Sequence, residues 1–309
     1  MPADSTNAPR EYRDRPLLGM ACKTVGAFLF SMLFASIRWL GPDFPIGEVV
    51  FFRSFFGIPV LVVTALMMGR PNLLVAKRID THAGRSISGA IGMYCNFAAY
   101  ALLPLADATA IGFASPLFVV ILAATILGER VHVYRWSAVI AGFIGVLIIV
   151  GPEANMSGAA LRGAGYAIAG AALTALAMIY LRRMSAHEHS ITIAFYYMIA
   201  TSLFSLFTIP FGWMIPTRNE TIALIFAGVS GGAGQLFLSL SYRFSEASAV
   251  APFDYTAMIW AVALGYFVFM ELPAPQVWLG ATIVIAAGLL ILWRERKLGR
   301  ERAPTHAAL

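Results

Sequence analysis

Two charged side chains lie inside long apolar stretches of this sequence, where a charge needs a partner or a function. Asp254 lies two residues after Pro252 in one stretch, and Arg53 directly follows Phe51 and Phe52 in another. A charge at bilayer depth costs several kcal/mol unless it is paired or hydrated. Each residue therefore predicts either a bound polar group or a buried counter-ion.

Both residues leave alternatives open. Arg53 stays charged at any working pH, so it could bind an anionic or carbonyl-bearing solute, or it could be a structural counter-ion to Asp254 or Glu48. Pro252 frees a backbone carbonyl, which favours a cavity at Asp254, although a wetted helix end would also accommodate this acid. We interpret Lys23 as a residue that extends along its helix to the cytoplasmic surface.

Uncharged polar side chains form the rest of the candidate site. Asn96 and Gln235 occupy nearly equivalent positions in the two halves of the sequence, and their amides could bind an uncharged heterocycle or join neighbouring helices. Several tyrosines lie within apolar stretches rather than at the interfaces where tyrosine collects, so they could stack on a planar solute. The candidate solute-binding residues are Arg53, Asn96, Tyr100, Tyr196, Tyr197, Gln235, Asp254 and Tyr255.

The elements that carry these residues are predicted to be membrane-spanning helices. Of the 309 residues, 59% are hydrophobic and 12% charged, whereas roughly 25% are charged in a soluble protein. Apolar stretches long enough to span a bilayer occur ten times. Their approximate limits are 17–40, 46–68, 86–103, 107–127, 134–151, 162–181, 190–210, 220–241, 247–269 and 275–293. The predicted fold class is therefore all-α, in a polytopic membrane protein.

The lysines and arginines predict the orientation. With the N-terminus inside, the predicted outer side keeps only Arg38, Arg162 and Arg218, while the cytoplasmic side receives the other loop and tail arginines. This asymmetry predicts a multi-pass inner-membrane protein with both termini cytoplasmic. The basic residues form no patch with interleaved aromatics, which argues against a nucleic-acid partner.

The sequence also repeats itself. Glu129 and Glu271 are each followed seven residues later by a tryptophan, and Arg38 relates to Arg182 by the same offset that relates Arg53 to Tyr197. A repeat of five helices is odd, so the second copy would be inverted, as in transporters that work by alternating access. Duplication as a mere route to a larger bundle is the alternative. The predicted parts are an N-terminal tail 1–16, repeats 17–151 and 162–293, and a basic tail 294–309.

Three short motifs carry a family resemblance. They are Phe51-Phe52-Arg53, Ser115-Pro116-Leu117-Phe118 ahead of Glu129, and Ala251-Pro252-Phe253-Asp254 ahead of Glu271. From about Leu17 to Trp293 the chain resembles the EamA family of the drug/metabolite transporter superfamily, and its ninth stretch is similar to that of bacterial riboflavin transporters. The resemblance implies ten helices around a central cavity built by helices 1–4 and 6–9, with helices 5 and 10 peripheral.

These features together predict a secondary transporter of a small, largely uncharged planar metabolite, with riboflavin uptake as the preferred case. An exporter of amino acids or related metabolites is the alternative, in which Arg53 and Asp254 would hold a carboxylate and an amine. A structural or receptor-like membrane protein is the alternative outside transport. The expected partners are the solute and the lipid bilayer, and association into a homodimer is left open.

Signals for other chemistry are lacking in the sequence. There is no phosphate-binding GxxxxGK[ST] loop, and His187 and His189 have no further ligand, so neither a cofactor nor a metal is expected. An intramembrane enzyme using Asp254 would need a second acid at comparable depth, and we identify none. Glu129 and Glu271, at the ends of spans, are predicted to be structural, joining helices 4–5 and 9–10 through helix caps or ion pairs.

Overall fold

The described part of the chain is built from helices, without a strand. The structure is a computed structural model, and it describes residues 15–76, 82–126, 133–150, 158–184, 188–245 and 250–302. The α-helices are α1 (Pro16–Leu40), α2 (Ile46–Met67), α3 (His82–Leu102), α4 (Leu105–Gly112), α5 (Ser115–Ile126), α6 (Val133–Val150), α7 (Gly158–Met184), α8 (Ser190–Leu206), α9 (Arg218–Phe244), α11 (Thr256–Phe269) and α12 (Pro275–Arg302). Short 3₁₀ helices lie between them: η2 (Pro71–Leu74), η4 (Ile209–Phe211) and η5 (Ala251–Tyr255).

Helix length and hydropathy agree with a polytopic membrane protein. Six helical segments of the described chain are long and apolar enough to cross a bilayer: Leu17–Leu40, Ile46–Met67, Leu105–Ile126, Gly158–Leu181, Arg218–Leu238 and Pro252–Phe269. Shorter apolar helices cover Trp136–Val150, Ile191–Leu206 and Pro275–Ile291. The predicted all-α class is confirmed, whereas the count of ten spans stays a prediction.

The outside of the bundle is apolar. Large side chains such as Leu147 of α6, Phe267 of α11 and Leu279 of α12 are 68%, 74% and 58% exposed. A surface that met water would carry polar residues at these positions. The exposed side chains therefore indicate contact with lipid.

Two of the predicted spans are interrupted in the structure. The predicted span 107–127 divides into α4 and α5, because Pro116 lies in the first turn of α5 and cannot donate a backbone hydrogen bond to the turn before it. In the predicted span 247–269, Pro252 lies in the 3₁₀ turn η5, and α11 begins only at Thr256. Discontinuous helices of this kind expose backbone and polar groups inside a bundle.

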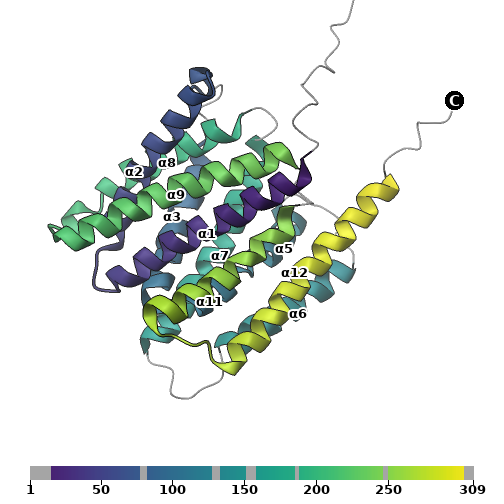
Figure 1. Ribbon diagram of the computed structural model, residues 1–309. Coiled ribbons are helices and arrows are strands. Elements are labelled where there is room, and N and C mark those ends of the chain that lie inside the picture. Colours follow the sequence, from purple (N-terminus) through teal and green to yellow (C-terminus); the bar gives the residue numbers. More distant parts are fainter. Residues whose placement is uncertain are drawn as a thin grey trace, which may run out of the picture.

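Glycines bring distant helices close together. α1 packs on α9, α3 packs on α7, and α2 lies against both α8 and α9 (Figure 1). At the crossing of α1 and α9, a Cβ on Gly26 would lie 3.4 Å from the carbonyl oxygen of Gly234. Small residues at such crossings allow the backbones of membrane helices to approach each other.

α6 and α12 pack together at one edge of the bundle, as the resemblance implies for helices 5 and 10 (Figure 1). A Cβ on Gly145 of α6 would lie 2.8 Å from the carbonyl oxygen of Gly280 in α12. The reverse contact, from Gly280 to the carbonyl oxygen of Gly145, is closer still. Neither glycine leaves room for a side chain.

Replacing Gly280 by valine should therefore separate α6 from α12. We expect a loss of about 1–3 kcal/mol in the free energy of unfolding, as at other overpacked sites. The measurement is the midpoint of thermal unfolding of the protein purified in detergent. Gly165→Val in α7 is the matched control, because a Cβ there would meet no heavy atom within 4 Å. Equal shifts in the two variants would contradict the close contact.

Candidate functional site

A cationic centre, which we define as Arg53, Arg85 and Tyr197, lies where α2, α3, α8 and α9 meet. Arg53 is buried, and Arg85 and Tyr197 are half-buried. Arg53 of α2 is 7% exposed, and its Nε and Nη1 atoms are buried without a hydrogen-bond partner. A Cβ on Gly231 of α9 would lie 3.2 Å from Arg53 Nε, so α9 covers the guanidinium. Arg85 and Tyr197 are within electrostatic reach of Arg53.

Arg85 of α3 lies over the ring of Tyr197 in α8. Its Cζ atom is 4.2 Å from the ring centroid, which is a cation–π contact. The Tyr197 hydroxyl donates to the carbonyl oxygen of Gly89 at 3.0 Å and holds the ring in place. The Nε and Nη1 atoms of Arg85 are buried without a hydrogen-bond partner, as they are in Arg53.

Small and hydroxylated residues make room for this centre and fix its walls. A Cβ on Gly89 of α3 would lie 2.7 Å from Cε2 of the Tyr197 ring and would displace Arg85 Nη1, so a side chain there would disturb the contact between the two residues. Next to Arg53, Thr201 Oγ1 of α8 donates to Ser54 Oγ of α2 at 2.9 Å. This bond joins the two helices within one turn of the arginine.

Gln235 is the predicted residue that shares the α9 face with Gly231. The two residues are four apart on one helix, a spacing that places side chains on the same face. Gln235 is half-buried. Of the predicted residues, the structure brings Arg53 and Tyr197 together, and Gln235 lies one turn along α9 from the glycine that covers Arg53.

Asn96 and Tyr100 face other helices. Asn96 Nδ2 donates to Thr174 Oγ1 of α7 at 3.2 Å, the interhelical bond that was the alternative to a binding role. Tyr100 stacks on Phe34 of α1 at a centroid distance of 4.0 Å, and its hydroxyl is 3.4 Å from Thr109 Oγ1 of α4. A contact of either residue with a solute stays a prediction.

Tyr196 and Tyr255 also contact other parts of the bundle. The Tyr196 hydroxyl accepts from the backbone N–H of Ala76, after η2, at 3.4 Å. The Tyr255 hydroxyl abuts Gly288 of α12, and its ring meets Phe113 edge-on at 5.1 Å. Binding roles for these two tyrosines likewise stay predictions.

Asp254 has a lysine as its counter-ion. Lys23 Nζ lies 2.8 Å from Asp254 Oδ1, and the Lys23 side chain is 3% exposed while that of Asp254 is 55% exposed. The interpretation of Lys23 as extending to the cytoplasmic surface was therefore wrong. Of the two alternatives for Arg53, the counter-ion to Asp254 or Glu48 is not what the structure shows, because Asp254 pairs with Lys23 and Glu48 Oε2 accepts from the backbone N–H of Met214 at 3.1 Å.

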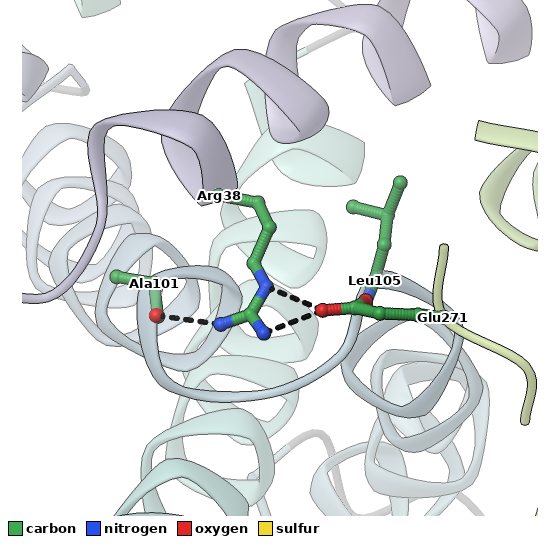
Figure 2. A network of polar contacts seen from close by, with 4 residues as sticks. All are labelled: Arg38, Ala101, Leu105 and Glu271. Carbon is green, nitrogen blue, oxygen red and sulfur yellow. Dashed lines mark hydrogen bonds and ion pairs between the residues drawn. The ribbon is translucent and has the colours of Figure 1, made fainter. Parts of the chain in front are cut away.

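A second charged contact joins α1 to the segment before α12, which are far apart in the sequence (Figure 2). Arg38 of α1 donates to Glu271 Oε1 from Nη2 at 2.6 Å and from Nε at 3.2 Å. Its Nη1 atom donates to the carbonyl oxygen of Ala101 at 3.0 Å, and the backbone N–H of Leu105 donates to Glu271 Oε2 at 3.4 Å. Glu271 forms an ion pair as predicted, but the prediction that it joins helices 9 and 10 was wrong, because its partners are on α1 and α4. Glu129 lies outside the described residues.

Sequence reasoning missed two residues of these clusters. Asp107 of α4 is within electrostatic reach of Arg38 and Glu271, and its buried Oδ1 atom has no hydrogen-bond partner. It is a second acid inside the bundle, which we had not identified. Arg85 was assigned to a basic loop, because the predicted span began at 86, whereas α3 begins at His82. The sequence signal that could have identified Arg85 is its spacing of four residues from Gly89, which places both residues on one face of a helix.

A crevice in the described part of the bundle lies away from these residues. It has a volume of about 380 Å³ and lies between α1, α9 and α11. Apart from Ser36 and Asn219, its lining is apolar, and it includes the exposed Trp39 and Val268. An apolar crevice on a lipid-facing surface does not explain the arginines of the cationic centre.

Comparison with known proteins identifies one family over both halves of the chain. The model of the EamA-like transporter family matches the chain twice, over residues 17–151 and 161–293. A solved crystal structure that is 18% identical superposes with a TM-score of 0.64, covering 91% of this chain and 98% of that one. At this identity the superposition supports the fold alone.

Curated relatives with similar sequence identity to this chain are named for different solutes. An S-adenosylmethionine uptake transporter of Rickettsia prowazekii is 31% identical, covering 87% of this chain and 92% of the relative. A pseudopaline exporter of Pseudomonas aeruginosa is 29% identical, covering 87% and 94%. A riboflavin transporter of Rhizobium johnstonii is also 29% identical, covering 94% and 95%. These names leave the solute of this chain unresolved.

Replacing Asp254 by asparagine should destabilise the protein, because Lys23 then keeps a buried charge beside a neutral amide. We expect a fraction of the roughly 3–5 kcal/mol seen for fully buried pairs, since the Asp254 side chain is 55% exposed. Thermal unfolding in detergent measures the loss. The double variant Lys23→Met with Asp254→Asn should recover most of it. Additive losses in the double variant would show that the pair does not stabilise the fold.

Proposed function

Because the chain belongs to the EamA-like transporter family, we propose that it is a secondary transporter that moves a small metabolite across the bacterial inner membrane by alternating access. The observation that carries the proposal is the cationic centre, whose polar groups come from both halves of an otherwise apolar bundle. A structural or receptor-like protein is the alternative from another class. It would bind a ligand without moving it across the membrane.

We infer that the chain forms ten spans as two inverted repeats, residues 17–151 and 162–293. The double match of the family model supports this inference. The helix pairings support it too, because α1 packs on α9 and α3 packs on α7. Each pairing unites the first helix of one half with the third helix of the other, as a two-fold axis requires. The axis would exchange inward-open and outward-open arrangements.

We further infer that both termini face the cytoplasm. The arginine and lysine asymmetry supports this orientation. The start of α1 and the end of α12 lie at the same end of the bundle (Figure 1). In this orientation the Arg38–Glu271 contact belongs to the outer side.

The Arg38–Glu271 contact would then hold the outer side closed. It ties the end of α1, the end of α3 and the start of α4 to the segment before α12. Alternating access needs these elements to separate once in each cycle, so the contact must break and re-form. A charged pair suits this role because water that enters an opening pathway can solvate both partners.

Riboflavin is one candidate solute. Two relatives named as riboflavin transporters, 29% and 26% identical, support it. Its flat ring system would stack on the tyrosines, and its imide and ribityl groups would bind the amides. It carries no negative charge, however, and would leave two arginines uncompensated.

The second candidate is a metabolite with a carboxylate, such as an amino acid or its derivative. Arg53 and Arg85 favour it, since neither has an acid partner among the described residues. S-adenosylmethionine, named for the relatives that are 31% identical, is itself an amino acid derivative with a carboxylate. The direction of transport differs between the named relatives, one group importing and another exporting.

Expression in a riboflavin auxotroph without its own uptake system separates the two candidates. With riboflavin supplied at a growth-limiting concentration, an importer of riboflavin should rescue growth relative to the empty vector. Rescue would support riboflavin as the solute. No rescue by a protein shown to be inserted in the membrane would favour the carboxylate-bearing metabolite.

Replacing Glu271 by glutamine should impair the transport cycle more than the fold. The ion pair becomes a neutral hydrogen bond, so the closed outer side loses stability and the open arrangement gains population. We expect slower net transport of the identified solute into proteoliposomes and faster labelling of a cysteine introduced at Ala106, next to Leu105. Arg38→Lys should have an intermediate effect on transport and labelling, because a lysine ammonium lacks the planar set of N–H donors with which arginine binds Glu271 and the Ala101 carbonyl together. Unchanged labelling and transport in both variants would contradict the gating role.

A further inference from the structure

We propose that Arg53 and Arg85 bind a carboxylate group of the transported solute, with the Tyr197 ring supporting the Arg85 guanidinium. This inference rests on the proposed transport function and specifies the chemical class of its substrate. It concerns a site in the interior of the bundle, away from the two ion pairs that the described residues form.

The lack of an acid beside either arginine is the first argument. The described acids inside the bundle lie elsewhere: Asp254 and Glu271 are paired with other cations, Glu48 accepts a backbone N–H, and Asp107 is within electrostatic reach of Arg38 and Glu271. Arg85 is within electrostatic reach of Arg53. Neither arginine forms an ion pair with an acid of the described residues. Buried charge of this kind is unfavourable unless a ligand or partner neutralises it.

The unused donors are the second argument. Each arginine has two buried nitrogens, Nε and Nη1, without an acceptor. A carboxylate offers two oxygens with about four lone-pair sites, and guanidinium binds it in a planar, bidentate manner. A single neutral carbonyl would satisfy fewer donors and would leave both positive charges in place.

The packing of Arg85 shows which part of the guanidinium is available. Arg85 Cζ lies 4.2 Å from the centroid of the Tyr197 ring, a cation–π contact that acts on the charge of the guanidinium. The Nε and Nη1 donors of Arg85 have no acceptor beside this contact. These donors therefore remain for a ligand.

The position of the centre agrees with a transport site. Arg53 is the eighth residue of α2 and Tyr197 the eighth of α8, which places each residue about 10 Å from the nearer end of its helix. The helices that meet here come from both halves of the chain, α2 and α3 from the first, α8 and α9 from the second. Secondary transporters bind their solutes at such a repeat interface near the middle of the bilayer.

The test measures binding to the purified full-length protein in nanodiscs. The probes are indole-3-acetate and indole-3-acetamide, which share a flat ring and differ in the carboxylate. Phenyl phosphate probes another oxyanion, and riboflavin probes an uncharged planar solute. We expect the acetate to bind about tenfold or more tightly than the amide, as expected for charge-assisted hydrogen bonds.

Variants then assign that preference to the two arginines. Arg53→Gln and Arg85→Gln should each reduce the acetate-over-amide ratio to within about twofold of unity, whereas the control Arg218→Gln, at an exposed position, should keep it. Thermal unfolding without ligand gives an independent measurement. Removing an uncompensated buried charge should leave the midpoint unchanged or raise it. A clearly lower midpoint for Arg53→Gln would mean that the arginine is structural and would overturn the proposal.

The remaining outcomes separate this inference from the transport function. Equal binding of acetate and amide to the wild type would overturn the carboxylate site, and so would arginine-dependent binding of phenyl phosphate in preference to the acetate. Uptake of riboflavin into proteoliposomes with no carboxylate preference would overturn the site and keep the transporter. Failure of every probe to bind, together with no uptake from a metabolite panel, would overturn the transport function itself.

Discussion

The cost of burying charge in a bundle that meets lipid organises the described part of this protein. Water cannot solvate charges inside the bilayer, so each charged side chain there needs a partner supplied by another helix. Arg38 finds Glu271 at a sequence separation of 233 residues, and Lys23 finds Asp254 across a similar distance along the chain. Both pairs have their cation on α1 and their acid in the last part of the chain. The charges therefore join the first helix of one half to the end of the other.

Two groups of the described chain depart from this pattern: Asp107, whose buried Oδ1 atom has no hydrogen-bond partner, and the cationic centre. Arg53 and Arg85 carry the same sign of charge, and the groups around them are a tyrosine ring, glycines and hydroxyls. A fold that only needed to be stable would gain from replacing such residues by apolar ones, as it would for many buried ion pairs. Under the proposed function, a carboxylate of the solute would supply the missing acceptor. The charges inside the described bundle thus divide into those that meet an opposite charge within the protein and those that the proposal assigns to the solute.

The sequence predicted the helices better than the contacts between their charges. Hydropathy sets the limits of a span over some twenty residues, so α1 and α2 begin and end within a residue or so of the predicted limits. The partner of Lys23 or Arg38 depends on how helices rotate and cross, which hydropathy does not encode. Arg85 was missed because a charged residue at the edge of an apolar stretch predicts a loop. The predicted span therefore began at residue 86, one residue after it. Asp107 was missed because it lies at the start of an apolar stretch, where an acid resembles a helix cap.

The packing of the same helices explains how charged contacts could change without loss of the fold. The crossings of α1 with α9 and of α6 with α12 are formed by glycines and backbone, through dispersion contacts that have no charge to compensate. Such surfaces can persist while one end of a helix pair opens, because the close contact lies within the helices rather than at their ends. The Arg38–Glu271 contact, by contrast, lies at helix ends, where an opening of a few ångströms admits water. Alternating access by relative motion of two repeats needs helix pairs that stay packed and helix ends that can separate. The glycine crossings would meet the first need, and the Arg38–Glu271 ion pair would meet the second.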